Sequence, residues 1–209
     1  MRAPAPTVYV VDDDPDVLKA IERLLQSIGL NVATFSSPHL FLERYDRNAP
    51  GCLLLDLDLP DLSGLDVQRV LEQRESVLPI VFLTGHGDIA ASVQAMKHGA
   101  ADFLTKPIDD TALIAAIDEA LARDQRLRPA HLERERIAKC LAMLTERESQ
   151  VLELIVAGRL NRQIAAELGT TEKTIKFHRG NLMRKMGVRV VADLVKLAER
   201  AGVGSTPRT

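Results

Sequence analysis

The sequence predicts an α/β domain with a five-stranded, doubly wound parallel sheet, followed by an all-α domain of four helices. Short aliphatic runs alternate with helical patterns through residues 7–123, which is typical of strands and crossover helices. The last third shows only helical patterns, and each of them ends in glycine. Charge divides the chain in the same way. Residues 1–123 carry 19 acidic and 10 basic side chains, whereas residues 124–209 carry 10 acidic and 17 basic ones. Two domains with different partners are therefore expected.

Five aliphatic segments are the expected strands, and each is followed by a helical pattern. The first, third and fourth are apolar on both faces, so they should be the central strands of a sheet covered on both sides. The strands are "TVYVV" (7–11), "NVATF" (31–35), "CLLLD" (52–56), "PIVFLT" (79–84) and "DFLT" (102–105).

The domain boundaries follow from these patterns. The α/β domain is expected over 1–123, a linker over 124–143 and the helical domain over 144–209. The linker is dense in charge and contains a single proline, so a solvated segment and a connecting helix both remain open.

Composition excludes several classes of protein. No apolar run approaches the ~20 residues of a membrane helix. The start, "MRAPAPT", lacks the apolar core of a signal peptide, so we expect a cytoplasmic protein. Cys52 and Cys140 lie far apart and fit no metal-binding spacing.

Acidic and polar side chains gather at the predicted strand ends. Asp12 and Asp13 follow the first strand, Asp56 ends the third, Thr84 ends the fourth and Lys106 follows the fifth. The carboxyl ends of parallel strands meet at one edge of the sheet, where such folds bind ligands. Three carboxylates repel one another, and oxygen ligands with room for water favour Mg²⁺. A lysine and a hydroxyl opposite the metal suit a phosphoryl group.

This set of residues, together with "DLDLPDLSG", "TGHGD" and "FLTKP", resembles the receiver domain of two-component response regulators, which has a flavodoxin/CheY-like fold. The resemblance implies that Asp56 accepts a phosphoryl group from a sensor histidine kinase. It also implies that Asp13, Asp56 and the carbonyl of Asp58 hold Mg²⁺, while Asp12 acts mainly through water. A carboxylate at 58 departs from the basic or polar residue more usual there, and its effect on the lifetime of the phosphoryl group stays open.

The same resemblance implies a switch and a dimer surface. Lys106 would pair with one phosphoryl oxygen, and Thr84 would hydrogen-bond another. Phe103 on the fifth strand would then turn inward, although plain core packing is an open alternative for it. Lys97 and Asp102 would belong to the surface through which the phosphorylated protein dimerises.

The basic half contains "NRQIAAELGTTEKTIKFHRGNLMRKMG", which has the form helix, turn, helix. Ile175, His178, Leu182 and Met186 recur at helical spacing and make one apolar stripe, so we expect His178 to be structural. Basic and polar groups on the outward face of a second helix are what a major-groove reader needs. That face carries Lys173, Lys176, Phe177, Gly180 and Arg184.

The segment from Leu144 to about Gly202 resembles the LuxR-type DNA-binding domain, and the whole chain resembles a regulator of the FixJ/NarL (LuxR-type helix-turn-helix) family. The resemblance implies base contacts by Lys176, Phe177 and Gly180. Phosphate contacts are implied for Lys173, Arg179, Arg184 and Lys185. Phenylalanine at 177 replaces a smaller aliphatic residue, and Val190–Val191 stand where a helix-capping serine is common. Base preference therefore does not transfer from relatives.

These inferences predict a transcription regulator rather than an enzyme. Phosphorylation of Asp56 would promote homodimerisation and sequence-specific binding to double-stranded DNA, with a sensor kinase and RNA polymerase as partners and no membrane. Two alternatives remain: an enzyme that hydrolyses phosphate esters through an aspartyl-phosphate, and a binding module that never takes phosphate. The enzyme class has a hydroxyl residue four places after its nucleophile, whereas Pro60 stands there in this chain.

Overall fold

A computed structural model describes residues 4–85 and 89–203, so residues 86–88 of the "TGHGD" motif lie outside the described residues. The chain divides into two compact units, Met1–Pro129 and Ala130–Thr209. The predicted linker, 124–143, is shared between these units. Within the described ranges, no helix combines the length and apolar character needed to cross a membrane.

The N-terminal unit is built on the predicted parallel sheet. Its described strands pair in the order β2-β1-β3-β4-β5, and all four pairings are parallel. All six residues of β3 are buried, as expected for a central strand that is apolar on both faces. The strands are β1 (Thr7–Val11), β2 (Asn31–Phe35), β3 (Gly51–Asp56), β4 (Ile80–Thr84) and β5 (Asp102–Thr105).

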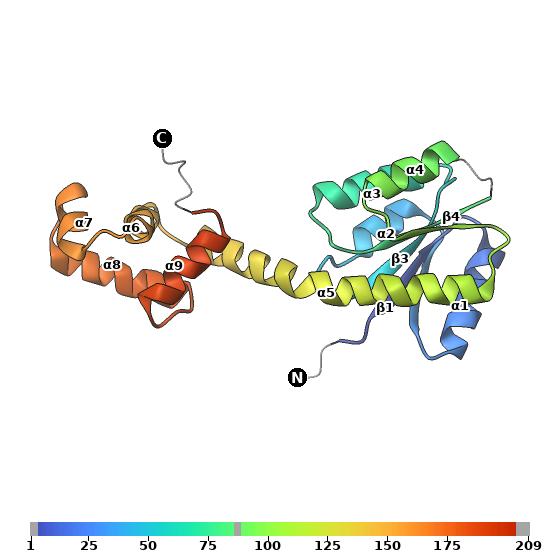
Figure 1. Cartoon of the computed structure of the whole chain (residues 1–209), viewed down its shortest axis with the longest axis horizontal. Helices are drawn as coiled ribbons and strands as arrows, with labels where there is room; N and C mark the ends of the chain where they lie inside the picture. Colours follow the sequence, from blue (N-terminus) through green and yellow to red (C-terminus); the bar gives the residue numbers. More distant parts are fainter. Residues whose placement is uncertain (1–3, 86–88, 204–209) are drawn as a thin grey trace. The chain divides into compact units, whose positions relative to one another are not determined.

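Helices cover both faces of the sheet (Figure 1). Successive side chains of a strand point to opposite faces. Val8 and Val10 therefore join one apolar cluster with α1 and α5, whereas Tyr9 and Val11 join another with α2 and α3. The helices of this unit are α1 (Pro15–Ser27), α2 (Pro38–Arg44), α3 (Gly64–Gln73), α4 (Ile89–Lys97) and the first part of α5 (Asp110–Ala142).

The segment 124–143 is helical almost throughout, because α5 runs from Asp110 to Ala142 with Pro129 inside it. The sequence left a solvated segment and a helix open, and the structure has a helix. Proline has no backbone N–H to donate within a helix, and this one stands where the two compact units divide.

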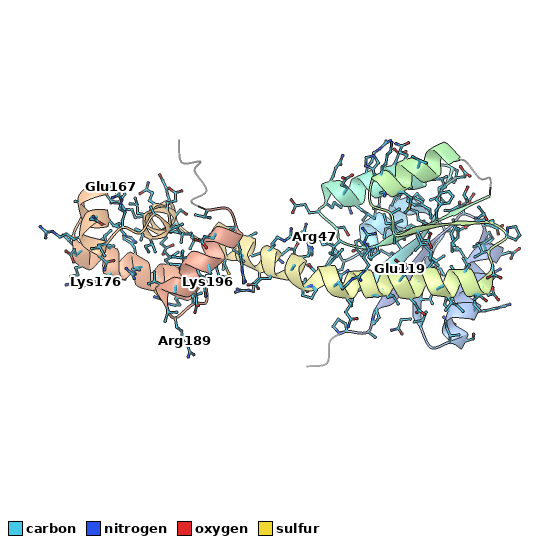
Figure 2. The ribbon with its side chains drawn as sticks, viewed as in Figure 1. Arg47, Glu119, Glu167, Lys176, Arg189 and Lys196 are labelled. Carbon is cyan, nitrogen blue, oxygen red and sulfur yellow. The ribbon has the colours of Figure 1, made fainter. Side chains whose placement is uncertain are left out.

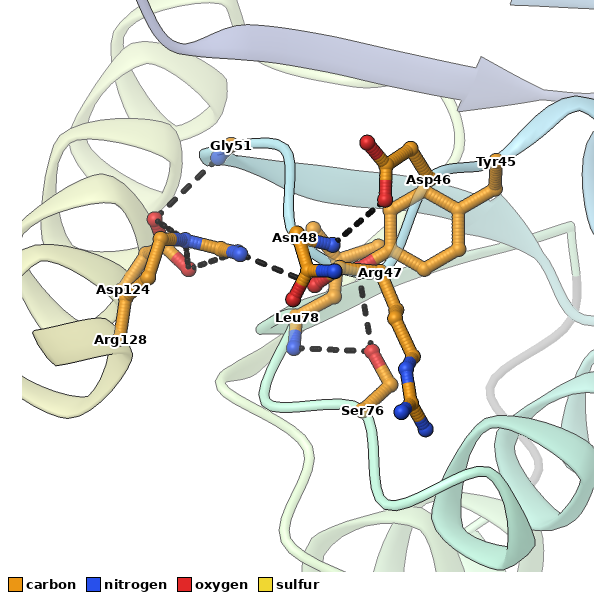
Figure 3. A network of polar contacts seen from close by, with 9 residues as sticks. All are labelled: Tyr45, Asp46, Arg47, Asn48, Gly51, Ser76, Leu78, Asp124 and Arg128. Atoms are coloured by element: carbon orange, nitrogen blue, oxygen red, sulfur yellow. Dashed lines mark hydrogen bonds and ion pairs between the residues drawn. The ribbon is translucent and has the colours of Figure 1, made fainter. Parts of the chain in front are cut away.

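A buried ion pair ties α5 to the start of β3 (Figure 3). Asp124 and Arg128 are 2% and 6% exposed. The Asp124 carboxylate accepts hydrogen bonds from Arg128 Nε at 2.9 Å and from the backbone N–H of Gly51 at 3.2 Å. Arg128 Nη1 in turn donates to the carbonyl of Arg47 at 3.0 Å. Both charges are therefore compensated although they lie away from water.

The C-terminal unit is helical, with a core that includes Ile164, Ile175 and Leu182, all fully buried. The apolar stripe predicted for the second helix of the helix-turn-helix is confirmed at Ile175, Leu182 and Met186, and His178 is half-buried beside it. The helices are the end of α5, α6 (Glu146–Val156), α7 (Asn161–Glu167), α8 (Glu172–Lys185) and α9 (Val191–Arg200).

Helix α9 begins without a side-chain cap. Val190 is its N-cap residue, is 53% exposed and has no oxygen to accept a hydrogen bond from the first turn. We expect Val190→Ser to raise the free energy of unfolding of the C-terminal unit by about 1 kcal/mol, because serine at this position accepts from an otherwise unpaired N–H. Calorimetry with Val190→Ala as the control tests this, and equal stabilities for serine and alanine would contradict it.

Candidate functional site

The carboxyl edge of the sheet brings the predicted acidic residues together. Asp12 directly follows β1 and is fully buried, and Asp56 is the last residue of β3 and 5% exposed. Asp13 lies next to them and is exposed. Carboxylate oxygens of these three residues all lie within 4.8 Å of one another. Thr84, the last residue of β4, is buried at the same edge of the sheet.

Lys106 supplies the positive charge of this pocket. It follows β5, which pairs with β4, and its Nζ lies 2.6 Å from Asp12 Oδ2 and 2.9 Å from Asp56 Oδ2. Burial raises the pKa of Asp12, and the hydrogen bond from Lys106 only partly offsets this. Burial acts to lower the pKa of Lys106, but the two carboxylates outweigh it and leave that pKa raised. The lysine side chain is 22% exposed, so it is dehydrated less than Asp12 and stays protonated.

Backbone groups orient the two buried carboxylates. The N–H of Asp14 donates to Asp12 Oδ1 at 2.9 Å, and the N–H of Asp58 donates to Asp56 Oδ1 at 3.3 Å. Gly64, the first residue of α3, closes the loop against the end of β3: a Cβ there would lie 2.6 Å from the carbonyl oxygen of Asp56. Sequence reasoning missed this positioning residue. A glycine in the first turn of a predicted helix, where it is unfavourable, was the available signal.

The carboxylate oxygens of this pocket suit a hard divalent cation. Three carboxylates face one ammonium group in the described part of this pocket, so a negative charge remains to be balanced. All the candidate ligands are oxygens, which suit Mg²⁺ better than zinc.

The ring predicted for the switch, Phe103, and the two residues predicted for the dimer surface lie on β5 and α4. Phe103 is half-buried in the cluster below the pocket, with its ring centroid 6.4 Å from that of Phe82. Asp102 Oδ1 accepts from the N–H of Phe103 at 2.8 Å, and Lys97 is exposed at the end of α4. The resting position of Phe103 is compatible with both core packing and a switch, so its role stays a prediction.

A basic face on α8 is the second candidate site. Its members are all exposed: Lys173, Lys176, Phe177, Gly180 and Arg184. Phe177 is 65% exposed, and Figure 2 labels Lys176 on the same helix. Arg189, in the turn between α8 and α9, is also exposed and points away from the ribbon in Figure 2, but it was absent from the predicted set. The only sequence signal for Arg189 was the basic excess of residues 124–209.

Two predicted phosphate contacts have partners inside the unit. Arg179 Nη1 donates to Asn161 Oδ1 at 2.7 Å and so ties α8 to the start of α7. Lys185 Nζ lies 2.6 Å from Glu148 Oε2 and donates to the carbonyl of Met143 at 3.0 Å. These bonds orient α8 within the unit. Contact of Arg179 and Lys185 with DNA stays a prediction.

We expect Glu148 to make the C-terminal unit sensitive to acid. It is 3% exposed, and its pKa is lowered first by the hydrogen bond from Lys185 and then by the N–H of Thr145. A carboxylate with a lowered folded pKa adds stability above its unfolded pKa, and this contribution is lost as the pH falls through the folded value. Wild type should therefore exceed Glu148→Gln in stability at neutral pH, and the difference should shrink below the ordinary glutamate pKa of 4.5.

Calorimetric unfolding as a function of pH measures this difference. Glu146→Gln is the matched control, since Glu146 is exposed in the same helical turn. A difference between wild type and Glu148→Gln that is independent of pH would contradict the assignment to charge.

Comparisons with known proteins agree with this geometry. The family model of the response regulator receiver domain matches residues 8–118, more than half of the chain. The model of bacterial regulatory proteins of the luxR family matches residues 142–198. The chain belongs to the response regulator family. It joins a receiver domain to a LuxR-type DNA-binding domain, as the sequence predicted.

Curated relatives of this response regulator match over almost its whole length. Response regulator protein TodT of Pseudomonas putida is 45% identical over 94% of this chain and 86% of that protein. Nodulation protein W of Bradyrhizobium diazoefficiens is 41% identical over 95% of this chain and 87% of that protein. Transcriptional regulatory protein FixJ of Azorhizobium caulinodans is 40% identical, covering 94% of this chain and 93% of that protein.

Solved structures of two relatives share the fold over almost the whole of this chain. The response regulator StyR is 44% identical with a TM-score of 0.73, and the match covers 94% of this chain and 100% of that one. Full-length FixJ from B. japonicum is 36% identical with a TM-score of 0.55, covering 94% and 97%. The α/β receiver with a helical DNA-binding domain is therefore the fold of this response regulator.

Proposed function

We propose that this response regulator controls transcription through phosphorylation of Asp56. A sensor histidine kinase donates the phosphoryl group, and the phosphorylated protein dimerises and binds specific DNA through α8. One observation carries the proposal: Asp12, Asp56 and Lys106 converge at the sheet edge of a chain whose other unit exposes a basic face on α8.

Asp56 is the nucleophile of the proposed transfer. A carboxylate oxygen of Asp56 attacks the phosphorus of the kinase phosphohistidine and the P–N bond breaks. The imidazole nitrogen takes the electron pair of that bond, and the ring leaves neutral because its other nitrogen already carries a proton. Because Lys106 Nζ lies 2.9 Å from Asp56 Oδ2, it needs little movement to pair with a phosphoryl oxygen once Asp56 carries the acyl phosphate. The Thr84 hydroxyl donates to another phosphoryl oxygen. These contacts act mainly by positioning and by charge stabilisation.

Mg²⁺ is the cofactor that the pocket suits. Asp13, Asp56 and the carbonyl of Asp58 would ligate it, and Asp12 would act through water. When bound, it supplies positive charge against the phosphoryl oxygens. Asp58 is exposed at the entrance of the pocket, where its carboxylate adds negative charge near the incoming group.

The proposed output begins at Thr84. Movement of Thr84 toward the phosphoryl group vacates space that the half-buried Phe103 ring fills. The face carrying Lys97 and Asp102 then takes the form that pairs with a second copy. Dimerisation through this face links the DNA-binding units of two protomers, so that binding of one unit holds the other near the neighbouring half-site. Phosphorylation of the receiver thereby raises the affinity of the DNA-binding unit for DNA.

DNA binding follows from the exposed face of α8. Lys176, Phe177 and Gly180 meet base edges in the major groove, while Lys173 and Arg184 contact phosphates. A dimer would place two such helices about one DNA turn apart. The regulator would thus act in the cytoplasm, where it encounters DNA and RNA polymerase, and as a switch rather than an enzyme.

Acetyl phosphate with Mg²⁺, applied to wild type and to Asp56→Asn, tests the proposal by intact mass and sedimentation. A gain of one phosphoryl mass with dimerisation in wild type alone supports the switch. Phosphate uptake without dimerisation would move activation to release of the DNA-binding unit. No uptake by wild type from acetyl phosphate or from a cognate kinase would overturn the phosphorylation step and favour a binding module.

A further inference from the structure

The exposed face of α8 contains one large apolar side chain among cations. Phe177 is 65% exposed, although its neighbours on that face are lysine, glycine and arginine. Its ring packs edge-on against His178, with centroids 5.8 Å apart and planes at 67°. His178 is half-buried, so this neighbour of the phenyl ring is held by the fold, while most of the Phe177 surface meets solvent.

A phenyl ring restricts what this position can recognise. It has no hydrogen-bond donor or acceptor, so it cannot pair with the amino, keto or ring-nitrogen groups that distinguish bases. Base faces are stacked inside a duplex and are out of reach from the major groove. The apolar group that does project into the major groove is the 5-methyl of thymine.

We propose that Phe177 is a specificity-determining residue that selects a thymine by packing on its 5-methyl group. This inference rests on the proposed binding of α8 in the major groove, and it adds the identity of a base. Lys176 and Lys173 attract the duplex, and Phe177 discriminates among its bases.

The helix surface beside Phe177 allows the close approach that such packing needs. Apart from the adjoining backbone of α8 itself, no atom of the described residues lies within 4 Å of a Cβ built on Gly180, one turn further along the helix. The backbone at this turn is bare, so base edges can reach the helix next to the ring. A protein partner could also cover an exposed phenyl ring, but the cations that surround it favour a polyanion.

The test starts from a random duplex library, because it requires no known operator. Wild type and Phe177→Ala, both treated with acetyl phosphate and Mg²⁺, select bound duplexes. We expect the wild-type consensus to contain a thymine in each half-site that Phe177→Ala no longer selects. Leu160→Ala is the matched control, because Leu160 is an exposed apolar residue of the same unit outside α8.

The selected site then carries uracil in place of each thymine in turn, which removes the methyl group alone. At the position that Phe177 reads, uracil should weaken wild-type binding roughly 3- to 10-fold, the effect of one lost methyl contact, and should leave Phe177→Ala binding unchanged. 5-Methylcytosine in place of cytosine at that position should recover part of the affinity. The slope of affinity against salt should match in both proteins, since phosphate contacts are unaltered.

The outcomes separate this inference from the function on which it rests. If both proteins select the same site and uracil affects them equally at every position, Phe177 reads no thymine while DNA binding stands. If neither protein selects any sequence, the proposed DNA binding fails and the inference fails with it. Circular dichroism establishes that Phe177→Ala is folded.

Discussion

Replacing Arg128 by methionine is expected to lower the free energy of unfolding of the receiver by about 3–5 kcal/mol, since removal of one partner leaves the other charge buried and unpaired. Asp124 is 2% exposed and, among the residues that the structure describes, would keep only the N–H of Gly51, at 3.2 Å. Burial acts to lower the pKa of Arg128, but its hydrogen bonds to Asp124 outweigh this and raise it. The guanidinium of Arg128 therefore remains charged in the wild-type protein.

Tyrosine fluorescence during urea unfolding reports on the receiver alone. The chain has two tyrosines and no tryptophan, and both Tyr9 and Tyr45 lie in the receiver. Arg126→Met is the matched control, because this arginine is exposed on the same helix. The double variant Asp124→Asn with Arg128→Met should recover much of the loss, since asparagine can still accept from Gly51 without a charge. An Arg128→Met receiver as stable as the Arg126→Met control would contradict the assignment.

Replacing Lys106 by methionine is expected to slow phosphoryl uptake from acetyl phosphate about 100-fold, the loss typical of one charged group that stabilises a transition state. Lys106 is the one ammonium that contacts both Asp12 and Asp56 in the described pocket, at 2.6 and 2.9 Å. Methionine keeps the unbranched aliphatic stem and removes the charge. Arginine should not restore the rate, because its larger planar head does not fit a point-charge position between two carboxylates.

Intact mass as a function of time measures the uptake at saturating Mg²⁺. Lys19→Met is the control, since Lys19 is an exposed lysine of the same domain that pairs only weakly with Asp16, at 3.6 Å. Mg²⁺ binding should survive in Lys106→Met, where one competing cation has been removed. A wild-type rate of uptake in this variant would show that the metal alone supplies the stabilising charge.

Much of the receiver could be predicted because its signals are local. Strands that are apolar on both faces belong at the centre of a covered parallel sheet, and β3 is buried at every residue. Once the strands are parallel, their carboxyl ends share an edge, so Asp12 and Asp56 must meet there. The stripe of Ile175, Leu182 and Met186 on α8 followed in the same way from helical spacing.

Other features depend on residues far apart in the chain. The sequence predicts Arg179 and Lys185 to be surface cations. In the structure Arg179 is hydrogen-bonded to Asn161, and Lys185 to Glu148, 37 positions away. The sequence signal for Gly64 was only a glycine in the first turn of a predicted helix, and its role followed from the 2.6 Å between a Cβ built there and the carbonyl oxygen of Asp56. The segment 124–143 could have been coil or helix on charge alone, and Asp124 meets Gly51 across 73 positions.

The sequence by itself determined the order of strands and helices, the acidic edge and the basic helix, because hydrophobic period and charge act over a few neighbouring residues. Only the tertiary structure decided which charged side chains are free for ligands and which are held inside. That choice depends on the burial and the hydrogen-bond partners that folding brings together, as the exposed Lys176 and the ion-paired Lys185 of the same helix illustrate.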